Sequence, residues 1–264
     1  NLHAIDRQSC LDSPCRIMVM EYCSGGDLFS YLEKGNRFTE GLARAVFQMF
    51  LETLECVHQQ GLFHGDLKLE NTMVGEDGRI RIIDFGFAEI SDPSKPNTVK
   101  KGTPLYMAPE VKDGKYNGKQ ADLFALGVLL FVMACRRYPY DMTDQEKKKY
   151  VVLPDQYKFF LFKKQEYWKS VDKFLANTPH KEAFKNLIDK MLAQKPEERL
   201  TIDQVREHQW YRSVEPLSNA EVKEALRLRK EGMSHKAVVT ARHKQQPAKG
   251  TSRCSFILEQ YTSE

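Results

Sequence analysis

Apolar residues recur every three or four positions over residues 39–60. This spacing predicts a long amphipathic helix that begins at Thr39 and ends before Gly61. The same spacing predicts a second amphipathic helix over 182–192. Residues 123–135 are apolar and uncharged throughout, so we expect a helix that is buried on all sides. That run is shorter than the roughly 20 residues a bilayer span needs.

Shorter patterns predict the remaining elements. The apolar residues 17–20 indicate a short buried strand that ends before Gly25 and Gly26. Between 143 and 180 the mixture of Lys, Tyr and Phe gives no clear boundaries. The other predictions are a helix capped by Asp27 to about Glu33, a hairpin of 72–74 with 80–83 around a turn at 76–78, a helix over 202–207, and a helix over 220–231 capped by Ser218.

Composition fits one large globular domain or two small ones, with 264 residues and 41% hydrophobic content. The net charge is +4, yet residues 221–253 alone carry nine Lys or Arg against three Glu. The basic character therefore belongs to the C-terminal end and not to the rest of the chain. The six cysteines lack metal-ligand spacing. Together with the lack of a visible signal peptide, they indicate reduced thiols and a cytoplasmic protein.

The chemistry is concentrated in residues 64–71, which read His-Gly-Asp-Leu-Lys-Leu-Glu-Asn, and in Asp84-Phe85-Gly86. Transfer of a phosphoryl group requires a carboxylate to meet the attacking hydroxyl. It also requires oxygen ligands for the magnesium that neutralises the phosphate charge. Asp66, Lys68, Asn71 and Asp84 supply this set within a short stretch of chain.

The order and spacing of these residues resemble the catalytic and magnesium-binding loops of eukaryotic protein kinases. Four further blocks, in the family's order, extend the resemblance over about residues 15–212. They are the hinge-like 19–28, the segment 102–110 with its Ala-Pro-Glu ending, 122–127 and 195–201. The resemblance implies an α+β, protein-kinase-like fold with a hinge and a mainly α-helical C-terminal lobe.

The resemblance assigns roles to the catalytic residues. Asp66 would be the catalytic base, Lys68 would meet the γ-phosphate of ATP, and Asn71 and Asp84 would bind Mg²⁺. Lysine at position 68 is typical of serine/threonine kinases and unusual in tyrosine kinases. Thr103 would lie beside Asp66 and Lys68 in the substrate site.

The resemblance also implies a nucleotide site along the hinge. Met20 matches the gatekeeper, and the backbones of Glu21 and Cys23 would face adenine. Met73 matches the residue that forms the floor of the adenine pocket. Asp27 would bond the ribose, but its role as a helix cap explains it equally well.

Several residues match structural positions of the family. His64 would pack against Phe85, and Asp122 would accept backbone hydrogen bonds from the catalytic loop, because a buried acid needs such partners. Arg199 would pair with Glu110.

Gly65 departs from the family, which usually has an arginine that contacts a phosphate on the activation segment. Switching by phosphorylation is therefore in doubt, although Ser91, Ser94 and Thr98 are available sites.

Residues 1–20 contain no glycine, lysine or glutamate. The glycine-rich loop and the lysine–glutamate pair that hold the ATP phosphates in this family are therefore absent from the sequence. We favour a fragment of a longer kinase over a natural protein that holds only the larger lobe. In either case we expect weak catalysis or none from this chain, and the alternative function is a pseudokinase-like binding or scaffold module. The platform-like segment 102–110 disfavours a small-molecule kinase.

The sequence divides into 1–23, the end of a small-lobe sheet with the hinge; 24–212, the C-terminal lobe; and 213–264, a basic tail that is helical and then disordered. Asp27 and Glu70 match acidic positions that bind an arginine upstream of the phosphosite, so the expected partners are protein substrates with basic residues there. The tail helix is interpreted as a solvated charged helix. Docking on the lobe, a calmodulin-like partner and an acidic surface are the alternatives. No nucleic-acid partner and no membrane span are expected.

Overall fold

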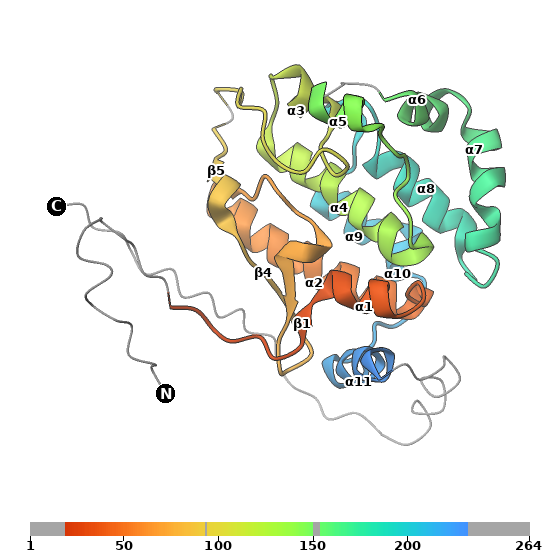
Figure 1. Ribbon diagram of the computed structural model, residues 1–264. Helices are drawn as coiled ribbons and strands as arrows, with labels where there is room; N and C mark the ends of the chain where they lie inside the picture. Colours follow the sequence, from red (N-terminus) through yellow and green to blue (C-terminus); the bar gives the residue numbers. More distant parts are fainter. Residues whose placement is uncertain (1–18, 93, 150–153, 232–264) are drawn as a thin grey trace.

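The computed structural model describes residues 19–92, 94–149 and 154–231, which form a mainly helical body with small sheets at one side (Figure 1). This mixture of helix and strand confirms the expected α+β class. The core is built around α4 (Gly118–Cys135), which packs between α2 (Glu40–Gln59) and α8 (Lys181–Met191).

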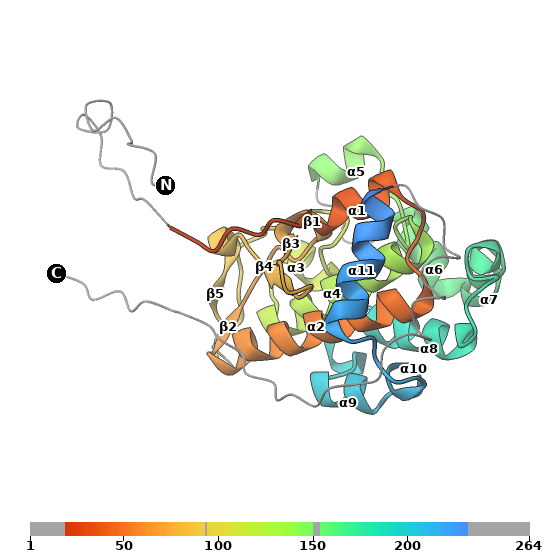
Figure 2. The ribbon, with the colours of Figure 1, turned by 90° about the horizontal axis from the view of Figure 1, so that it is seen from below.

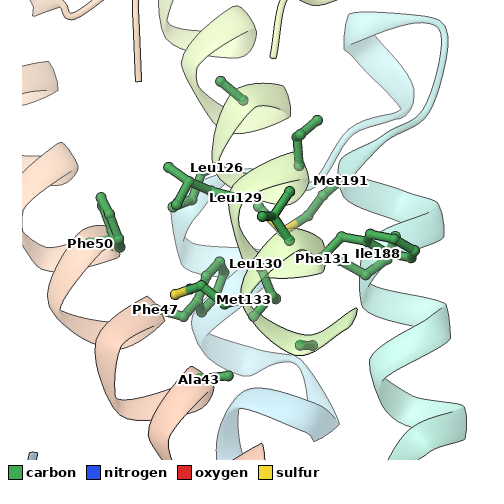
Figure 3. Packing of buried hydrophobic residues seen from close by; sticks show 14 of the residues in the cluster. Ala43, Phe47, Phe50, Leu126, Leu129, Leu130, Phe131, Met133, Ile188 and Met191 are labelled. Carbon is green, nitrogen blue, oxygen red and sulfur yellow. The ribbon is translucent and has the colours of Figure 1, made fainter. Parts of the chain in front are cut away.

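Large apolar side chains fill the space between these three helices (Figure 3). Phe47 and Phe50 come from α2, Leu129 and Leu130 from α4, and Ile188 from α8, and all five are fully buried. The predictions of α2 and α8 from helical spacing are confirmed. The uninterrupted apolar run 123–135 forms a buried helix as expected, because α4 has neighbours on every side.

Helix α4 is also the one helix in the described part of the chain that is long and apolar enough to cross a membrane by length and composition. However, 83% of it is buried against the rest of the protein. A fully surrounded core helix explains the same composition without a bilayer.

Two small sheets lie beside the helices. The first has the order β1 (Gly26–Asp27), β3 (Thr72–Val74) and β4 (Ile80–Ile82), with antiparallel neighbours. The second pairs β2 (Leu62–Phe63) with β5 (Glu89–Ile90), so that Phe63 lies opposite Glu89. The predicted hairpin is therefore confirmed. The second sheet was not predicted, because two-residue strands leave no periodic pattern.

The other helices are short. Asp27 caps α1 (Leu28–Lys34) by accepting a hydrogen bond from the backbone N–H of Ser30 at 2.8 Å, and Thr39 caps α2, both as predicted. The remaining elements are α3 (Pro109–Asp113), α5 (Asp144–Lys149), α6 (Asp155–Phe162), α7 (Lys164–Val171), α9 (Ile202–Glu207), α10 (Gln209–Arg212) and the 3₁₀ helices η1 (Leu69–Asn71), η2 (Phe85–Phe87), η3 (Asp172–Phe174) and η4 (Pro196–Glu198).

The stretch 143–180, which the sequence left without boundaries, is organised by aromatic packing. Tyr157, Phe160 and Tyr167 are buried, and the hydroxyls of Tyr157 and Tyr167 donate to the backbone oxygens of Leu192 and Pro139 at 2.9 and 2.7 Å. Large aromatic rings with a satisfied hydroxyl anchor short helices that backbone propensity alone would not hold.

The predicted buried strand at 17–20 is wrong where it can be checked. Val19 and Met20 are outside any strand and are 84% and 66% exposed, while residues 17 and 18 lie outside the described residues. Within the described chain no strand pairs with this stretch. A strand without a partner leaves its backbone groups unsatisfied and is not stable by itself.

The tail helix α11 (Asn219–Lys230) is docked on the body, so its interpretation as a solvated helix is wrong. Figure 2 shows α11 lying across α1 and α2, and Val222, Ala225 and Leu226 are at most 1% exposed. The helix is amphipathic, and its apolar stripe decides its position despite the basic residues on the other face. The segment predicted to be disordered after Gly232 lies outside the described residues.

Candidate active site

One buried carboxylate fixes the backbone that leads into residues 64–71. Asp122, near the start of α4, is 1% exposed. It accepts hydrogen bonds from the backbone N–H groups of His64 and Gly65 at 2.8 and 3.0 Å, and its Oδ2 lies 3.0 Å from Nε2 of His58. The expectation that Asp122 binds catalytic-loop backbone is confirmed. The contribution of His58 was missed, because its position on α2 gave no sign of a partner in α4.

Asp66 is the centre of the candidate site. Its side chain is 2% exposed, and its Oδ2 lies 2.7 Å from Nζ of Lys68 and 3.1 Å from Nδ2 of Asn71. Its Oδ1 accepts hydrogen bonds from the backbone N–H and the hydroxyl of Thr103 at 2.8 and 2.7 Å. Lys68 also donates to the Thr103 hydroxyl at 3.1 Å. These four residues, which sequence reasoning placed in one site, are in direct contact.

Two opposing effects act on the pKa of Asp66. Burial raises it, while hydrogen bonds from Lys68 and Thr103 together with the Lys68 charge lower it. The lowering effects prevail, so the pKa of Asp66 lies below its usual value. Asp66 is thus a carboxylate at neutral pH, with both oxygens held by Lys68, Asn71 and Thr103.

Asp84 is placed next to the catalytic loop through its backbone neighbour. The Ile83 N–H donates to the carbonyl oxygen of Asn71 at 2.9 Å, and the Ile83 carbonyl lies 3.0 Å from Nε2 of His64. Since Nδ1 of His64 accepts from the Asp66 N–H at 3.2 Å, Nε2 carries the proton and donates to Ile83. The His64 ring also lies 4.9 Å from that of Phe85, as predicted.

The oxygen atoms of Asn71 and Asp84 fit a magnesium ion. The amide nitrogen of Asn71 is used by Asp66, through its Oδ2 and its main-chain oxygen, both at 3.1 Å, which leaves the amide oxygen available. Asp84 is exposed, has a left-handed backbone (φ +62°), and accepts a hydrogen bond at Oδ1 from the Gly86 N–H at 3.2 Å. Hard oxygen ligands of this kind, completed by phosphate oxygens and water, are what Mg²⁺ prefers. Among the described residues, no three His, Cys, Asp or Glu side chains form a metal cluster of their own.

The predicted nucleotide residues lie along the β3–β4 hairpin. Met73 is paired with Asp27 on one side and Arg81 on the other, and Arg81 donates to Glu21 at 3.1 Å. The Asp27 carboxylate is used by Ser30, through its N–H at 2.8 Å and its hydroxyl at 2.6 Å, so its role as a helix cap is observed.

Two further hinge residues differ in burial. Cys23 is 8% exposed and Met20 is 66% exposed. Met73 thus lies in the central strand β3, between Asp27 of β1 and Arg81 of β4, and Glu21 contacts this sheet through Arg81.

The predicted pairing of Arg199 with Glu110 is present and buried. Arg199 Nη2 lies 2.6 Å from Oε2 of Glu110, and the two side chains are 0% and 10% exposed. The guanidinium also donates to the backbone oxygen of Ala193 at 2.9 Å and lies over the Phe124 ring at 4.9 Å. The pair ties the end of segment 84–110 to the loop after α8.

The comparisons with known proteins agree with this geometry. Residues 7–211 match the family described as Protein kinase domain. The chain therefore belongs to the protein kinase family.

Its similar proteins are serine/threonine and calcium-dependent protein kinases. Serine/threonine-protein kinase SIK1 of Mus musculus is 32% identical over 73% of this chain and 23% of its own length. Calcium-dependent protein kinase 22 of Oryza sativa subsp. japonica is 32% identical over 84% of this chain and 37% of its own length. CBL-interacting serine/threonine-protein kinase 13 of Arabidopsis thaliana is 33% identical over 74% of this chain and 36% of its own length. The chain thus spans less than two fifths of each of these relatives.

Proposed function

We propose that this chain carries the catalytic half of a serine/threonine protein kinase, which moves the γ-phosphate of ATP to a protein hydroxyl. The observation that supports it best is the buried Asp66 carboxylate, held by Lys68, Asn71 and Thr103. Preorganised charge and position account for most of the catalysis of phosphoryl transfer. The kinase relatives, together with the buried Cys23 and Cys135, which form no disulfide, support a cytoplasmic enzyme.

In the proposed reaction each of these residues has a separate role. Asp66 orients the substrate hydroxyl and takes its proton as the hydroxyl oxygen bonds to the γ-phosphorus and the bond to the leaving ADP breaks. Lys68 places its ammonium beside Asp66, where it stabilises the negative charge of the transferred group. Asn71 and Asp84 would hold Mg²⁺, which when bound neutralises the phosphate oxygens.

We further propose that the chain as given transfers phosphate weakly or not at all. Residues 1–20 have no lysine or glutamate to hold the α- and β-phosphates, and loss of such positioning is costly. A non-catalytic scaffold is the second candidate function. Transfer by the complete protein that depends on Asp84 would separate the two candidates.

The proposed substrates are proteins with an arginine upstream of the phosphosite. Glu70 supports this proposal because its side chain is exposed on η1, between Lys68 and Asn71. Asp27 offers weaker support, since Ser30 already uses its carboxylate. A tail-binding regulatory partner is also proposed, and it would compete with the docked position of α11.

The decisive experiment is radiolabelled phosphate transfer by the complete protein to a peptide pair with Arg or Ala upstream of the serine. Asp84→Asn removes one charge from the proposed magnesium ligands, so we expect a loss of transfer of at least about 100-fold, equal to about 3 kcal/mol of transition-state stabilisation. Transfer should also fall when the upstream Arg is replaced by Ala.

The matched control is Asp203→Asn, the same substitution at an exposed position of α9. It should keep full transfer and the same thermal stability. If Asp84→Asn transferred phosphate as fast as Asp203→Asn does, the magnesium assignment would be rejected, and if the complete protein transferred no phosphate in any form, the proposed enzyme would be rejected.

A further inference from the structure

Lys101 has an unusual environment for a lysine in a long polar loop. Its side chain is only 8% exposed. Its ammonium lies 2.6 Å from Oε1 of Glu89 and 5.1 Å from the centre of the Phe63 ring. Lysine side chains rarely bury unless the charge is paired. The position of Lys101 is therefore fixed by Glu89 and Phe63.

Glu89 connects three parts of the chain. It lies in β5 directly opposite Phe63 of β2, so it is anchored to the strand that leads into Asp66. Its Oε2 accepts a hydrogen bond from Nδ2 of Asn97 at 3.0 Å. The backbone of Asn97 in turn exchanges hydrogen bonds with that of Tyr116, at 2.9 and 3.1 Å. One carboxylate thus holds both position 97 and position 101.

The residue after Lys101 is in close contact with the catalytic loop. Gly102 and Gly65 both have positive φ, +103° and +79°. A Cβ atom on Gly102 would lie 2.6 Å from the carbonyl oxygen of Gly65, so only glycine permits this approach. The contact places Thr103, the next residue, within hydrogen-bond distance of Asp66.

We infer that Glu89 and Lys101 are a pair of positioning residues that hold segment 97–103 against the catalytic loop, so that Thr103 binds and orients Asp66. Because Glu89 already neutralises Lys101, the segment is ordered without an added phosphate. The placement of Asp66 then depends on a charge pair within the chain. The statement about catalysis rests on the proposed function, whereas the statement about the placement of Thr103 does not.

The pairing of Glu89 with Lys101 has a consequence for phosphorylation of the neighbouring hydroxyls. Ser94 and Thr98 are exposed, Thr98 within the segment 97–103 that Glu89 and Lys101 hold and Ser94 three residues before it. A phosphate on either hydroxyl would have to compete with Glu89 for Lys101, because the two side chains are already paired at 2.6 Å. Removal of these hydroxyls should therefore leave the segment ordered.

The first test measures amide hydrogen exchange of peptides spanning 97–106 in the unphosphorylated protein. Lys101→Met and Glu89→Gln each remove one charge of the pair and should speed exchange at least about 10-fold, by opening the segment locally. The double variant Glu89→Lys with Lys101→Glu restores opposite charges and should regain much of the protection. Lys100→Met, at the exposed neighbouring position, is the matched control and should exchange like the parent protein.

The second test uses the complete protein and separates kcat from KM. The charge-removing variants should lose about 10-fold or more in kcat with KM for ATP unchanged, because Thr103 orients the base and not the nucleotide. The triple variant Ser91→Ala, Ser94→Ala, Thr98→Ala should keep both the exchange rate and kcat. Transfer by this variant as slow as that of Lys101→Met would overturn the inference.

The two tests fail independently. Exchange in Lys101→Met and Glu89→Gln equal to that of Lys100→Met would reject the pair, whatever the protein catalyses. Faster exchange in both variants, with no phosphate transfer by any form of the complete protein, would keep the structural role and reject the proposed function.

Discussion

A few contacts decide whether the pKa of a buried side chain favours its charged form. They outweigh burial at Asp66, whereas burial prevails at Lys112. The pKa of Asp66 is lowered because hydrogen bonds outweigh burial. Its contribution to stability is therefore present above its unfolded pKa of about 4 and is lost as pH falls through the lower folded value. In Lys112 burial outweighs the attraction of Glu146, since the described neighbours of its ammonium are the sulfur of Met142 at 3.8 Å and the Tyr140 ring at 5.8 Å.

Lys112→Met should therefore stabilise the protein at neutral pH. Burial lowers the pKa of Lys112 from 10.5 to about 8, against the opposing attraction of Glu146. A shift of that size corresponds to a cost of about 3 kcal/mol while the lysine is charged. The cost is complete below pH 8 and disappears as pH rises toward 10.5, because the unfolded chain then also loses the proton. We expect urea unfolding at pH 7 to show a gain of about 1–3 kcal/mol that shrinks toward pH 10.

The control for this prediction is Lys115→Met, which removes an exposed lysine from the adjoining loop. It should change the free energy of unfolding by less than about 0.5 kcal/mol at either pH. A gain in Lys112→Met that was the same at pH 7 and pH 10 would mean that packing of the methionine, and not the lysine charge, is responsible.

The resemblance to the kinase motifs predicted which residues of the candidate site lie together. Asp66, Lys68, Asn71 and Thr103 meet as the motif implied. The positions of His58, Glu89 and Lys101 could not be predicted, because each finds its partner across an element boundary that the sequence does not show. A buried lysine and an exposed one look identical in a polar loop until the loop's path is known.

At the scale of elements, the crossing of α4 and α8 depends on one glycine. A Cβ atom on Gly127 would lie 2.8 Å from Cβ of Met191 and 3.1 Å from Cδ2 of Leu192. The small residue lets the two helices approach closely. The crossing therefore takes place where α4 has no side chain.

Gly127→Ala should destabilise the protein, although alanine favours helix. The added methyl forces α4 and α8 apart, at a cost of about 1–3 kcal/mol that exceeds the helix-propensity gain. Gly41→Ala in α2 is the matched control, since no atom lies within 4 Å of its added Cβ. It should stabilise by up to about 1 kcal/mol. Chemical denaturation should give a lower free energy of unfolding for Gly127→Ala and a higher one for Gly41→Ala. A higher free energy of unfolding in both variants would show that α4 and α8 can move apart to accept the added methyl.

Helices could be predicted from the sequence where their buried residues recur at a regular spacing. Helices α2 and α8 followed from their apolar stripes. The strand at 17–20 failed because a strand needs a partner that periodicity does not supply. Helices α6 and α7 were not assigned because rings, and not an apolar stripe, define their buried faces.

At the scale of the whole molecule, α11 joins parts that are distant in the chain. A Cβ atom on Gly78, in the hairpin turn, would lie 2.4 Å from the carbonyl oxygen of Asn219. At the other end of the helix, Arg229 donates to the backbone oxygen of Arg37 at 2.6 Å and lies 4.7 Å from the centre of the Phe38 ring. The helix thus connects the hairpin to the loop between α1 and α2.

Leu226→Ala should weaken the whole body and not only the tail. The side chain is 1% exposed, so its truncation should cost about 2–5 kcal/mol. Hydrogen exchange should also speed up in α1, which α11 covers. Arg227→Ala, which removes only exposed ion pairs with Glu224 and Glu231, should cost less than about 1 kcal/mol. Unchanged exchange in α1 of Leu226→Ala would show that the helix is an independent appendage.

The docked position of α11 also determines where the protein can be truncated for expression. The match to the family model ends at residue 211, eight residues before α11 begins at Asn219. A protein truncated after residue 211 would lack α11. Apolar surface on α1 and α2 would then be exposed, and the protein would tend to aggregate. The boundary for bacterial expression therefore belongs after residue 231 at the earliest, so that α11 keeps its contacts with α1 and α2.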